Sequence, residues 1–191
     1  MFSDAYRLGA PKLHHRYECL LNGLHRKHPE LAIQEERKRS VLAASTFNAT
    51  SPVVSIPHKD FQNFGPGWCA ITALGKFNPT NGGHLILWEF KLVIEFPRGS
   101  TILIPSALVT HSNTTIGEGE TRMSITQYTA GALFRWAACG YRSMSSLTAD
   151  QQAELKRGAS ERAAQGIALF SKLSDVRKTH DVQMLSSAVV R

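Results

Sequence analysis

Long apolar runs are missing from this chain of 191 residues. No stretch approaches the roughly 20 apolar residues that a membrane-spanning helix needs. The start, MFSDAYRLGAPK, also lacks the apolar core of a secretory signal. We therefore expect an intracellular protein, nuclear or nucleo-cytoplasmic, that makes no contact with a membrane.

Cysteine is scarce: Cys19, Cys69 and Cys139 are the three in the chain, and they are far apart in sequence. They form no CxxC pair, so they build neither a disulfide framework nor a cysteine-rich zinc module. The sequence predicts that each is a small buried hydrophobic residue. Internal repeats and low-complexity tracts are also absent.

Acidic residues are outnumbered, with 15 Asp and Glu against 22 Lys and Arg, which gives a formal net charge of +7. A basic balance favours a polyanionic partner such as nucleic acid, and the alternative is a solvated basic surface without a partner. Hydrophobic residues make up 42% of the chain and charged residues 19%, as in a folded protein. At this length we expect one domain, 1–191, and a monomer.

The first part of the chain, residues 1–39, is polar and basic. Within it, Tyr17, Leu20, Leu21 and Leu24 recur at helical spacing and predict a helix. The charge run EERKR at 35–39 is short and half acidic, so it favours a solvated helix end over a nuclear-import cluster.

The middle of the chain, residues 40–136, is strand-like almost throughout. In KLVIEF, Leu92, Ile94 and Phe96 alternate with other residues, as in a strand with one face in the core. Turn signals at PTNGG and PRG separate the apolar segments. The strand-like segments are SVLAASTFNA, WCAITALGKF, GGHLILWEFKLVIEF, STILIPSALVTH and RMSITQYTAGALFRW. Many short strands predict an antiparallel sandwich or small barrel of the jelly-roll type.

The end of the chain turns helical. Thr148 has the character of an N-cap, and a stripe of apolar residues at spacings of three and four follows it as far as Leu173. The stripe consists of Leu155, Ala159, Ala163, Ile167, Phe170 and Leu173. We expect one helix over 148–173 that is able to pack on the sheet. The predicted fold is thus mainly β (α+β), a jelly-roll or cupin-like core with flanking helices at both ends.

A candidate metal site begins in SIPHKDFQNFGPGW, where His58 and Asp60 are two residues apart. In a strand such residues point to the same side, so both can reach one ion. Two histidines and a carboxylate on one face of an octahedron commonly hold ferrous iron. His111, at the end of ILIPSALVTHSN, follows a hydrophobic strand and can supply the third ligand. Taken singly, His58 and Asp60 are more typical of a polar turn, and His111 of a strand-end histidine that donates to a carbonyl.

A candidate carboxylate anchor follows eleven residues after His111, in GETRMSIT. Arg122 and Ser124 alternate onto one face, and a guanidinium fork beside a hydroxyl matches a carboxylate. The alternative is a surface arginine beside Glu118 and Glu120, which would contribute little to stability.

The order HxD, distant His, RxS resembles the iron(II)- and 2-oxoglutarate-dependent dioxygenases with a double-stranded β-helix core. HKDFQN looks like the His-Arg/Lys-Asp-x-x-Asn motif of the ten-eleven-translocation and J-binding-protein (TET/JBP) nucleobase oxygenases. GWCAITALGKF, GGHLILWEFKLVIEFPRGSTILIPSA, HSN and TR.S.TQYTAG.LFRW are similar to the fungal branch of that family. The resemblance spans residues 40–173, including ERAAQGIALFSKL.

The resemblance implies a role for each matching residue. Three residues would be catalytic iron ligands: His58, Asp60 and His111. Arg122, helped by Ser124, would pair with the distal carboxylate of 2-oxoglutarate, with dioxygen as the second co-substrate. Asn63 would touch the flipped target base and Tyr128 would stack against it, as base-modifying enzymes hold a base outside the duplex. Asn48, on the preceding strand, could hold the other end of 2-oxoglutarate. Asn63 is equally typical of a turn, and Tyr128 of the core.

The chain also departs from the family. Ala130 stands where animal members carry a base-contacting histidine. The identity of the target base therefore cannot be carried over from those members, and both 5-methylcytosine and N6-methyladenine stay candidates. The cysteine-rich zinc region of animal members is missing, and the chain is short, which predicts a truncated copy with abbreviated DNA-gripping elements.

The resemblance therefore implies an enzyme of DNA demethylation that oxidises the methyl group of a modified base in DNA. Two alternatives stay open. One is a 2-oxoglutarate-dependent hydroxylase of a protein or small molecule, because a fold does not fix a substrate. The other is an inactive oxygenase-like domain that binds DNA through its basic surface.

Overall fold

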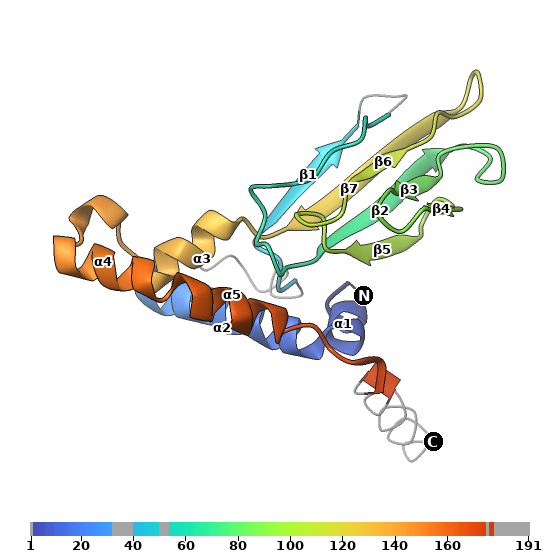
Figure 1. The fold of residues 1–191 in the computed structure, drawn as a ribbon. Coiled ribbons are helices and arrows are strands. Elements are labelled where there is room, and N and C mark those ends of the chain that lie inside the picture. The colour runs from blue at the N-terminus through green and yellow to red at the C-terminus, as the bar shows by residue number, and fades with distance from the viewer. Residues whose placement is uncertain (1, 32–39, 50–53, 175, 178–191) are drawn as a thin grey trace, which may run out of the picture. The chain divides into compact units, whose positions relative to one another are not determined.

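The structure, a computed structural model, describes residues 2–31, 40–49, 54–174 and 176–177 (Figure 1). The charge run at 35–39 lies outside these residues. The chain divides into two compact units. The β unit comprises Leu42–Phe134, and the helical unit comprises Met1–Val41 together with Arg135–Arg191.

The β unit contains two antiparallel sheets. The larger sheet has the strand order β1-β7-β2-β5, and the smaller one has the order β4-β3-β6. Figure 1 shows the long strands β2 and β7 beside each other in the larger sheet. The strands are β1 (Ala44–Asn48), β2 (Cys69–Lys76), β3 (Leu85–Leu87), β4 (Leu92–Ile94), β5 (Thr101–Ile104), β6 (His111–Asn113) and β7 (Thr121–Tyr128). The fold is thus mixed, and the helices of the described residues hold more residues than the strands, so "mainly β" applies to the β unit alone.

The core of the β unit lies around β2. Five successive residues from Cys69 to Ala73 are buried, so side chains on both faces of β2 are covered. Burying large apolar side chains here supplies the main stabilising contribution, roughly 1.5–3 kcal/mol for each Leu, Ile or Phe. The buried cluster consists of Cys69, Ile71, Ala73, Phe77, Leu85, Leu87, Phe96, Ile104 and Val109.

Two expected strands differ in the structure. The stretch WEFK forms a tight turn between β3 and β4, in which the Lys91 amide donates to the Trp88 carbonyl at 3.1 Å. Lys91 has a φ of +53°, a conformation that residues with a Cβ adopt rarely. No glycine or asparagine marks this turn, so no local pattern of residues predicts it. Of the alternating residues, Phe96 is buried while Leu92 is 50% exposed, because β4 is an edge strand.

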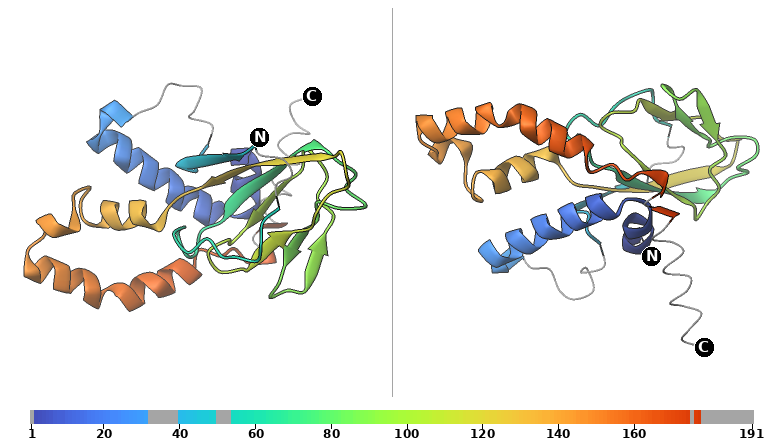
Figure 2. Two further views of the ribbon diagram at one scale, coloured as in Figure 1. Left: turned by 90° about the horizontal axis from the view of Figure 1, so that it is seen from above. Right: turned by 60° about the horizontal axis from the view of Figure 1, so that its bottom comes forward.

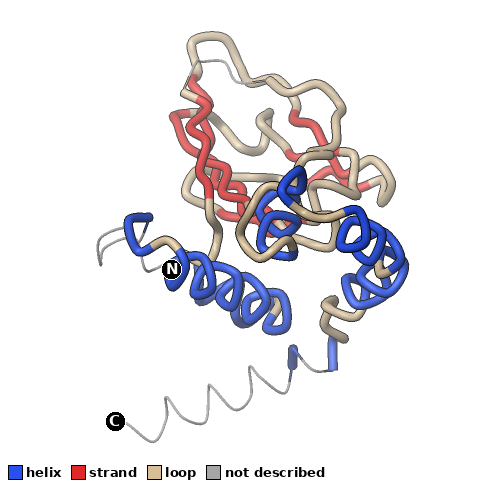
Figure 3. The backbone as a smooth tube through the Cα atoms, turned by 90° about the vertical axis from the view of Figure 1, so that its left-hand side faces the viewer, coloured by secondary structure: helices blue, strands red, loops and turns tan. Residues whose placement is uncertain are grey.

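The second difference follows β7. Residues 131–136, expected to continue the strand, open the helix α3 (Gly131–Ala138). Much of the β unit lies in loops between short strands, as the tan segments in Figure 3 show. These loops carry His58, Asp60 and Asn63, whereas the other candidate site residues lie in strands: Asn48, His111, Arg122, Ser124 and Tyr128.

The helical unit begins with α1 (Phe2–Gly9), α2 (Pro11–Lys27) and the short 3-10 helix η1 (Pro29–Leu31). Proline starts α2, where the backbone amide that it lacks would have no partner within the helix. Basic residues end the helix, where they interact favourably with the negative end of its dipole. Tyr17 of α2 meets Tyr6 edge-on, with ring centroids 5.6 Å apart. Both rings are fully buried and form the centre of this unit.

The C-terminal helix expected over 148–173 is two helices, α4 (Ala149–Arg157) and α5 (Ala159–Ile167). Gly158 ends the first and begins the second, and both run in nearly the same direction (Figure 2). Thr148 caps α4 as expected, in a capping box with Gln151. The apolar stripe is not buried along its length: Ile167 is 70% and Leu173 65% exposed.

The cysteines divide by environment. Cys69 and Cys139 are buried, as expected, whereas Cys19 is exposed on α2 with its sulfur 3.5 Å from Nε2 of His15. Burial raises the pKa of the Cys69 thiol to about 12, so this thiol stays protonated and unreactive. No helix in the described part of the chain is long and apolar enough to cross a membrane.

The excess of positive charge belongs to one unit. The helical unit carries 17 Lys and Arg against 10 Asp and Glu, whereas the β unit carries five of each. The formal net charge of +7 therefore belongs wholly to the helical unit, and the β unit is neutral.

Candidate metal centre

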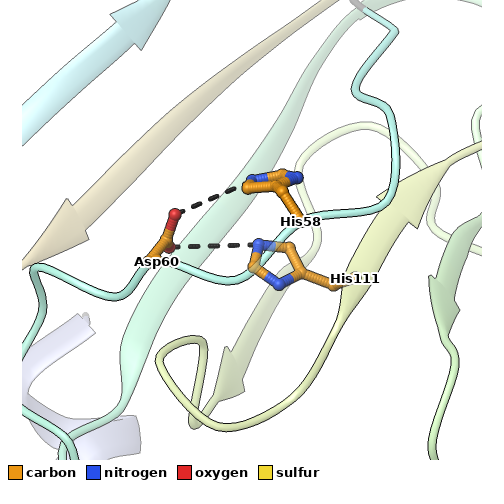
Figure 4. A group of neighbouring side chains, drawn as sticks. All are labelled: His58, Asp60 and His111. Carbon is orange, nitrogen blue, oxygen red and sulfur yellow. Dashed lines mark ion pairs between the residues drawn. The ribbon is translucent and has the colours of Figure 1, made fainter.

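Three side chains of the β unit converge on one point. One ligand atom from each of His58, Asp60 and His111 lies within 4.8 Å of the others. Figure 4 shows the Asp60 carboxylate facing both rings, with its oxygens 3.7 Å from Nε2 of His58 and 3.9 Å from Nε2 of His111. These separations leave room for an ion between the donor atoms. Two imidazoles and a carboxylate are a donor set suited to non-haem iron.

The backbone holds the two histidines as a pair. His58 and His111 exchange both of their amide–carbonyl hydrogen bonds, at 3.1 and 2.9 Å, in an antiparallel bridge. Their ring centroids are 4.4 Å apart. His111 lies in β6, but His58 and Asp60 lie in a loop. The side chains of His58 and Asp60 therefore face one point although the segment that carries them is not the predicted strand.

Backbone carbonyls fix which nitrogen of each neutral ring carries the hydrogen. Nδ1 of His58 lies 2.8 Å from the carbonyl oxygen of Ile56, and Nδ1 of His111 lies 3.0 Å from that of Val109. Because a carbonyl oxygen only accepts, each Nδ1 carries the hydrogen. The lone pair of each neutral ring is then on Nε2, the atom that faces Asp60. Such an outer hydrogen bond orients a metal-binding histidine and raises its basicity.

Asp60 is oriented by a second set of contacts. Its amide donates to the Ser106 carbonyl at 2.9 Å. The Asn63 amide nitrogen donates to Oδ2 of Asp60 at 3.3 Å and to the Ser106 hydroxyl at 3.1 Å. Ser106 is 1% exposed and was not predicted, because a serine in a Pro-Ser-Ala turn carries no local signal of this role.

Beside the three ligands lies a cavity of about 860 Å³, and Arg122 lines it. Arg122 is 3% exposed, and burial lowers the pKa of its guanidinium, which means that the charge is poorly solvated. A buried cation is stabilised by a carboxylate that enters the same space. The cavity thus brings together a metal-binding donor set and a buried cation.

Ser124 and Asn48 also line the cavity, on neighbouring strands. The register places them opposite each other, and the Asn48 amide donates to the Ser124 hydroxyl oxygen at 3.0 Å. This contact occupies an acceptor position of Ser124, so its own hydrogen is free to be donated to an anion in the cavity. Asn48 therefore meets Ser124 in the structure, and its contact with a co-substrate stays a prediction.

The two residues expected to touch a base, Asn63 and Tyr128, line the same cavity, and so does Ala130. Asn63 and Ala130 face each other in an isolated β-bridge. The Tyr128 hydroxyl accepts a hydrogen bond from Thr46 at 3.4 Å, and the ring packs against the core cluster. Tyr128 thus contacts the core, as one of its two interpretations requires, and also lines the cavity. Base contacts by these residues stay predictions.

Glu89 connects the two chain segments that carry the ligands, and the sequence alone does not predict this role. Its carboxylate accepts from the Thr110 amide at 2.8 Å and from the Thr110 hydroxyl at 2.7 Å. It also pairs with Lys59 Nζ at 3.0 Å. Lys59 lies between His58 and Asp60, and Thr110 directly precedes His111. Hydrogen bonds from Thr110, then from Lys59, lower the pKa of Glu89 to about 2. The charge that makes this tie is therefore lost only as the pH falls through about 2.

Replacing Glu89 by alanine is expected to weaken iron(II) binding about 10- to 100-fold, as the loss of an outer-sphere partner does elsewhere. The ligands and the backbone bridge between His58 and His111 remain, but the contacts of Glu89 with Lys59 and Thr110 are lost. Anaerobic titration with iron(II) measures this affinity.

Glu120 provides the matched control, because its carboxylate accepts from two backbone amides, of Asn78 at 2.7 Å and of Gly117 at 2.8 Å. Neither loop carries a metal ligand. Equal iron affinities of Glu89→Ala and Glu120→Ala would contradict the role given to Glu89.

Comparison with known proteins gives a limited result. No family model matches the sequence, and no curated protein matches it. Among solved structures, the chain is similar to NgTET1 in complex with 5mC DNA, with 17% sequence identity and a TM-score of 0.43. The alignment covers 52% of this chain and 39% of that chain. The fungal branch of the TET/JBP family stays a prediction from the sequence.

Proposed function

We propose that this protein is an iron(II)- and 2-oxoglutarate-dependent dioxygenase that oxidises the methyl group of a modified base in DNA. The observation that carries the proposal is the convergence of His58, Asp60 and His111 on one point of a cavity that a buried Arg122 also lines. The proposal includes a double-stranded β-helix for the two antiparallel sheets, and a nuclear location. Candidate substrates are 5-methylcytosine and N6-methyladenine.

Iron, when bound, would couple the oxidative decarboxylation of 2-oxoglutarate to insertion of oxygen into a C–H bond. The overall reaction balances: 2-oxoglutarate, dioxygen and a methyl group give succinate, carbon dioxide and a hydroxymethyl group. His58, Asp60 and His111 would hold the ion and leave the cavity side open to both substrates.

Arg122 would fix the distal carboxylate of 2-oxoglutarate. Its guanidinium is already desolvated, so the pairing replaces little water and the charges attract strongly. Ser124 would donate a second hydrogen bond, because its acceptor position is taken by Asn48. The chelating end of the co-substrate would then face the three ligands.

Asn63, Tyr128 and the small Ala130 line the cavity and would receive the base. The small side chain of Ala130 leaves space in the cavity where a larger residue would limit the size of the base. Both candidate bases are therefore tested. The Asn63 amide nitrogen is engaged by Asp60 and Ser106, so its side-chain oxygen is the atom free to accept from a base amino group.

Succinate release tests the reaction and its substrate class together. The protein with iron(II), 2-oxoglutarate and oxygen is incubated with DNA containing 5-methylcytosine or N6-methyladenine, and with peptides. We expect succinate in proportion to hydroxymethylated base, measured by mass spectrometry, with DNA alone. Succinate that appears only with peptides would favour a protein hydroxylase, and DNA binding without succinate would favour an inactive domain.

The charge distribution predicts where DNA is gripped. Replacing basic residues of the helical unit by glutamine is expected to lower the salt dependence of DNA affinity. The slope of log binding constant against log salt concentration should fall by about one for each phosphate contact that is lost. The same number of neutralisations in the β unit changes net charge equally but is expected to leave the slope unchanged. The two sets of glutamine substitutions are Arg26, Lys27 and Lys156 in the helical unit, and Lys76, Lys91 and Arg98 in the β unit. Equal slopes for the two variants would contradict this assignment.

A further inference from the structure

Two apolar side chains flank the candidate metal ligands and point into solvent. Ile56 precedes His58 by two residues and is 79% exposed, and Phe61 directly follows Asp60 and is 82% exposed. These are the highest exposures among the large hydrophobic residues that the structure describes. Phe61 also lines the cavity that contains the ligands, so its ring lies at the mouth of the candidate site.

The backbone on either side of Phe61 is fixed. Its amide donates to the Lys59 carbonyl at 3.0 Å, and the Asn63 amide donates to the Asp60 carbonyl at 2.9 Å. Beyond the turn, the Phe64 ring stacks on Phe134 with centroids 3.8 Å apart. The turn that carries Phe61 therefore cannot fold inward to bury the ring without breaking these contacts and moving Asp60.

The mouth of the cavity offers little free charge to a nucleic acid. The β unit is neutral, Lys59 is paired with Glu89, and Arg122 is buried within the cavity. A strand that reaches this surface is therefore held there by contacts that do not depend on charge. Stacking on an aromatic ring is such a contact, and every nucleobase has a face for it.

We propose that Phe61 stacks on the nucleobase next to the one being oxidised. This inference rests on the proposed function and identifies part of its substrate surface. The base being oxidised must reach the ligands inside the cavity, whereas Phe61 is exposed at the rim, so the ring meets a neighbouring base. An apolar side chain in this place also fills the gap that a flipped base leaves in the stack.

The chain supplies a matched control for Phe61. Phe47 is 70% exposed in β1, between Thr46 and Asn48, which both line the cavity. Because neighbouring residues of a strand point to opposite faces, the Phe47 ring is directed away from the cavity. Phe61→Ala and Phe47→Ala thus remove the same exposed ring from the two sides of this unit.

The test is the affinity of the full chain for a methylated single-stranded oligonucleotide, measured by fluorescence anisotropy at several salt concentrations. We expect Phe61→Ala to weaken binding about tenfold, a typical loss for one stacked base. The loss is expected to be the same at every salt concentration, so that the log–log slope is unchanged, while Phe61→Trp restores the affinity. Phe47→Ala is expected to bind like the wild type.

A second readout reports the stack itself. With 2-aminopurine beside the methylated base, we expect its fluorescence to be quenched by the wild type and by Phe61→Trp, and to be brighter with Phe61→Ala. The inference is overturned if Phe61→Ala binds as tightly as the wild type, if Phe47→Ala weakens binding as much, or if no oligonucleotide binds. It is also overturned if Phe61→Ala lowers the melting temperature without changing affinity, because the ring then packs on the chain itself.

Failure of this inference is separable from failure of the proposed function. If Phe61→Ala binds DNA with wild-type affinity and still oxidises it, the stacking role of Phe61 is refuted and the proposed function stands. If binding and quenching are as expected but no oxidised base forms, the stacking role of Phe61 stands and the proposed function is refuted.

Discussion

Replacing His58 or Asp60 by alanine is expected to abolish iron(II) binding and, with it, succinate formation. The three candidate ligands are the only described group of this kind, and loss of one leaves two donors at a site that needs three. We expect turnover to fall below detection in both variants. Anaerobic iron titration and succinate release measure the two effects.

The same loss of an imidazole elsewhere in the β unit serves as the control. His84 bonds through Nε2 to the Pro79 carbonyl at 2.7 Å and is not part of the metal group. His84→Ala is expected to bind iron and turn over normally. Full activity of His58→Ala or Asp60→Ala would contradict the metal assignment.

Replacing Arg122 by methionine is expected to raise the concentration of 2-oxoglutarate needed for half-maximal turnover by about 100-fold or more, as the loss of a buried charge partner does. Methionine keeps much of the length and apolar volume of the side chain, so the fold loses little packing. Iron affinity is expected to be unchanged, because Arg122 is not among the metal-binding group. Co-substrate binding and iron binding, each followed by titration, separate the two.

Arg98 is exposed and gives the control for loss of a guanidinium from the β unit. Arg98→Met is expected to bind 2-oxoglutarate like the wild type, and Arg122→Lys to fall between the wild type and Arg122→Met, because it keeps the charge without the fork. An unchanged half-saturating concentration in Arg122→Met would show that another group binds the co-substrate.

The parts of the site that could be predicted are those set by short-range spacing. His58 and Asp60 were paired because they are two residues apart, and they do face one point, although in a loop and not in a strand. Arg122 and Ser124 alternate within β7, a real strand, so both line the cavity as the period of two requires. The position of His111 at the end of a hydrophobic segment predicts a strand-borne ligand, and His111 is the first residue of β6.

The parts that could not be predicted depend on contacts between distant segments. Glu89 joins Lys59 and Thr110 across 30 and 21 positions of the chain, and nothing in WEFK indicates this. The same stretch was expected to be a strand because its aromatic residues favour one. Its turn requires a positive φ at Lys91, which no local preference of lysine supplies. Ser106 likewise becomes a site residue only when the fold brings it to Asn63.

The division of charge has a similar origin. Composition predicted a polyanionic partner for the chain as a whole, but only the structure shows that the helical unit holds all of the excess. The two kinds of DNA contact proposed here, salt-dependent at the helical unit and salt-independent at Phe61, follow from that division.

The most direct test of the central claim is an anaerobic titration of the wild-type protein with iron(II) and 2-oxoglutarate, before any DNA or oxygen is added. We predict one equivalent of each, with 2-oxoglutarate binding that depends on iron and is weakened by Arg122→Met. On admitting oxygen with methylated DNA, mass spectrometry should find the hydroxymethylated base. Failure of 2-oxoglutarate to bind the iron-loaded protein would contradict the account.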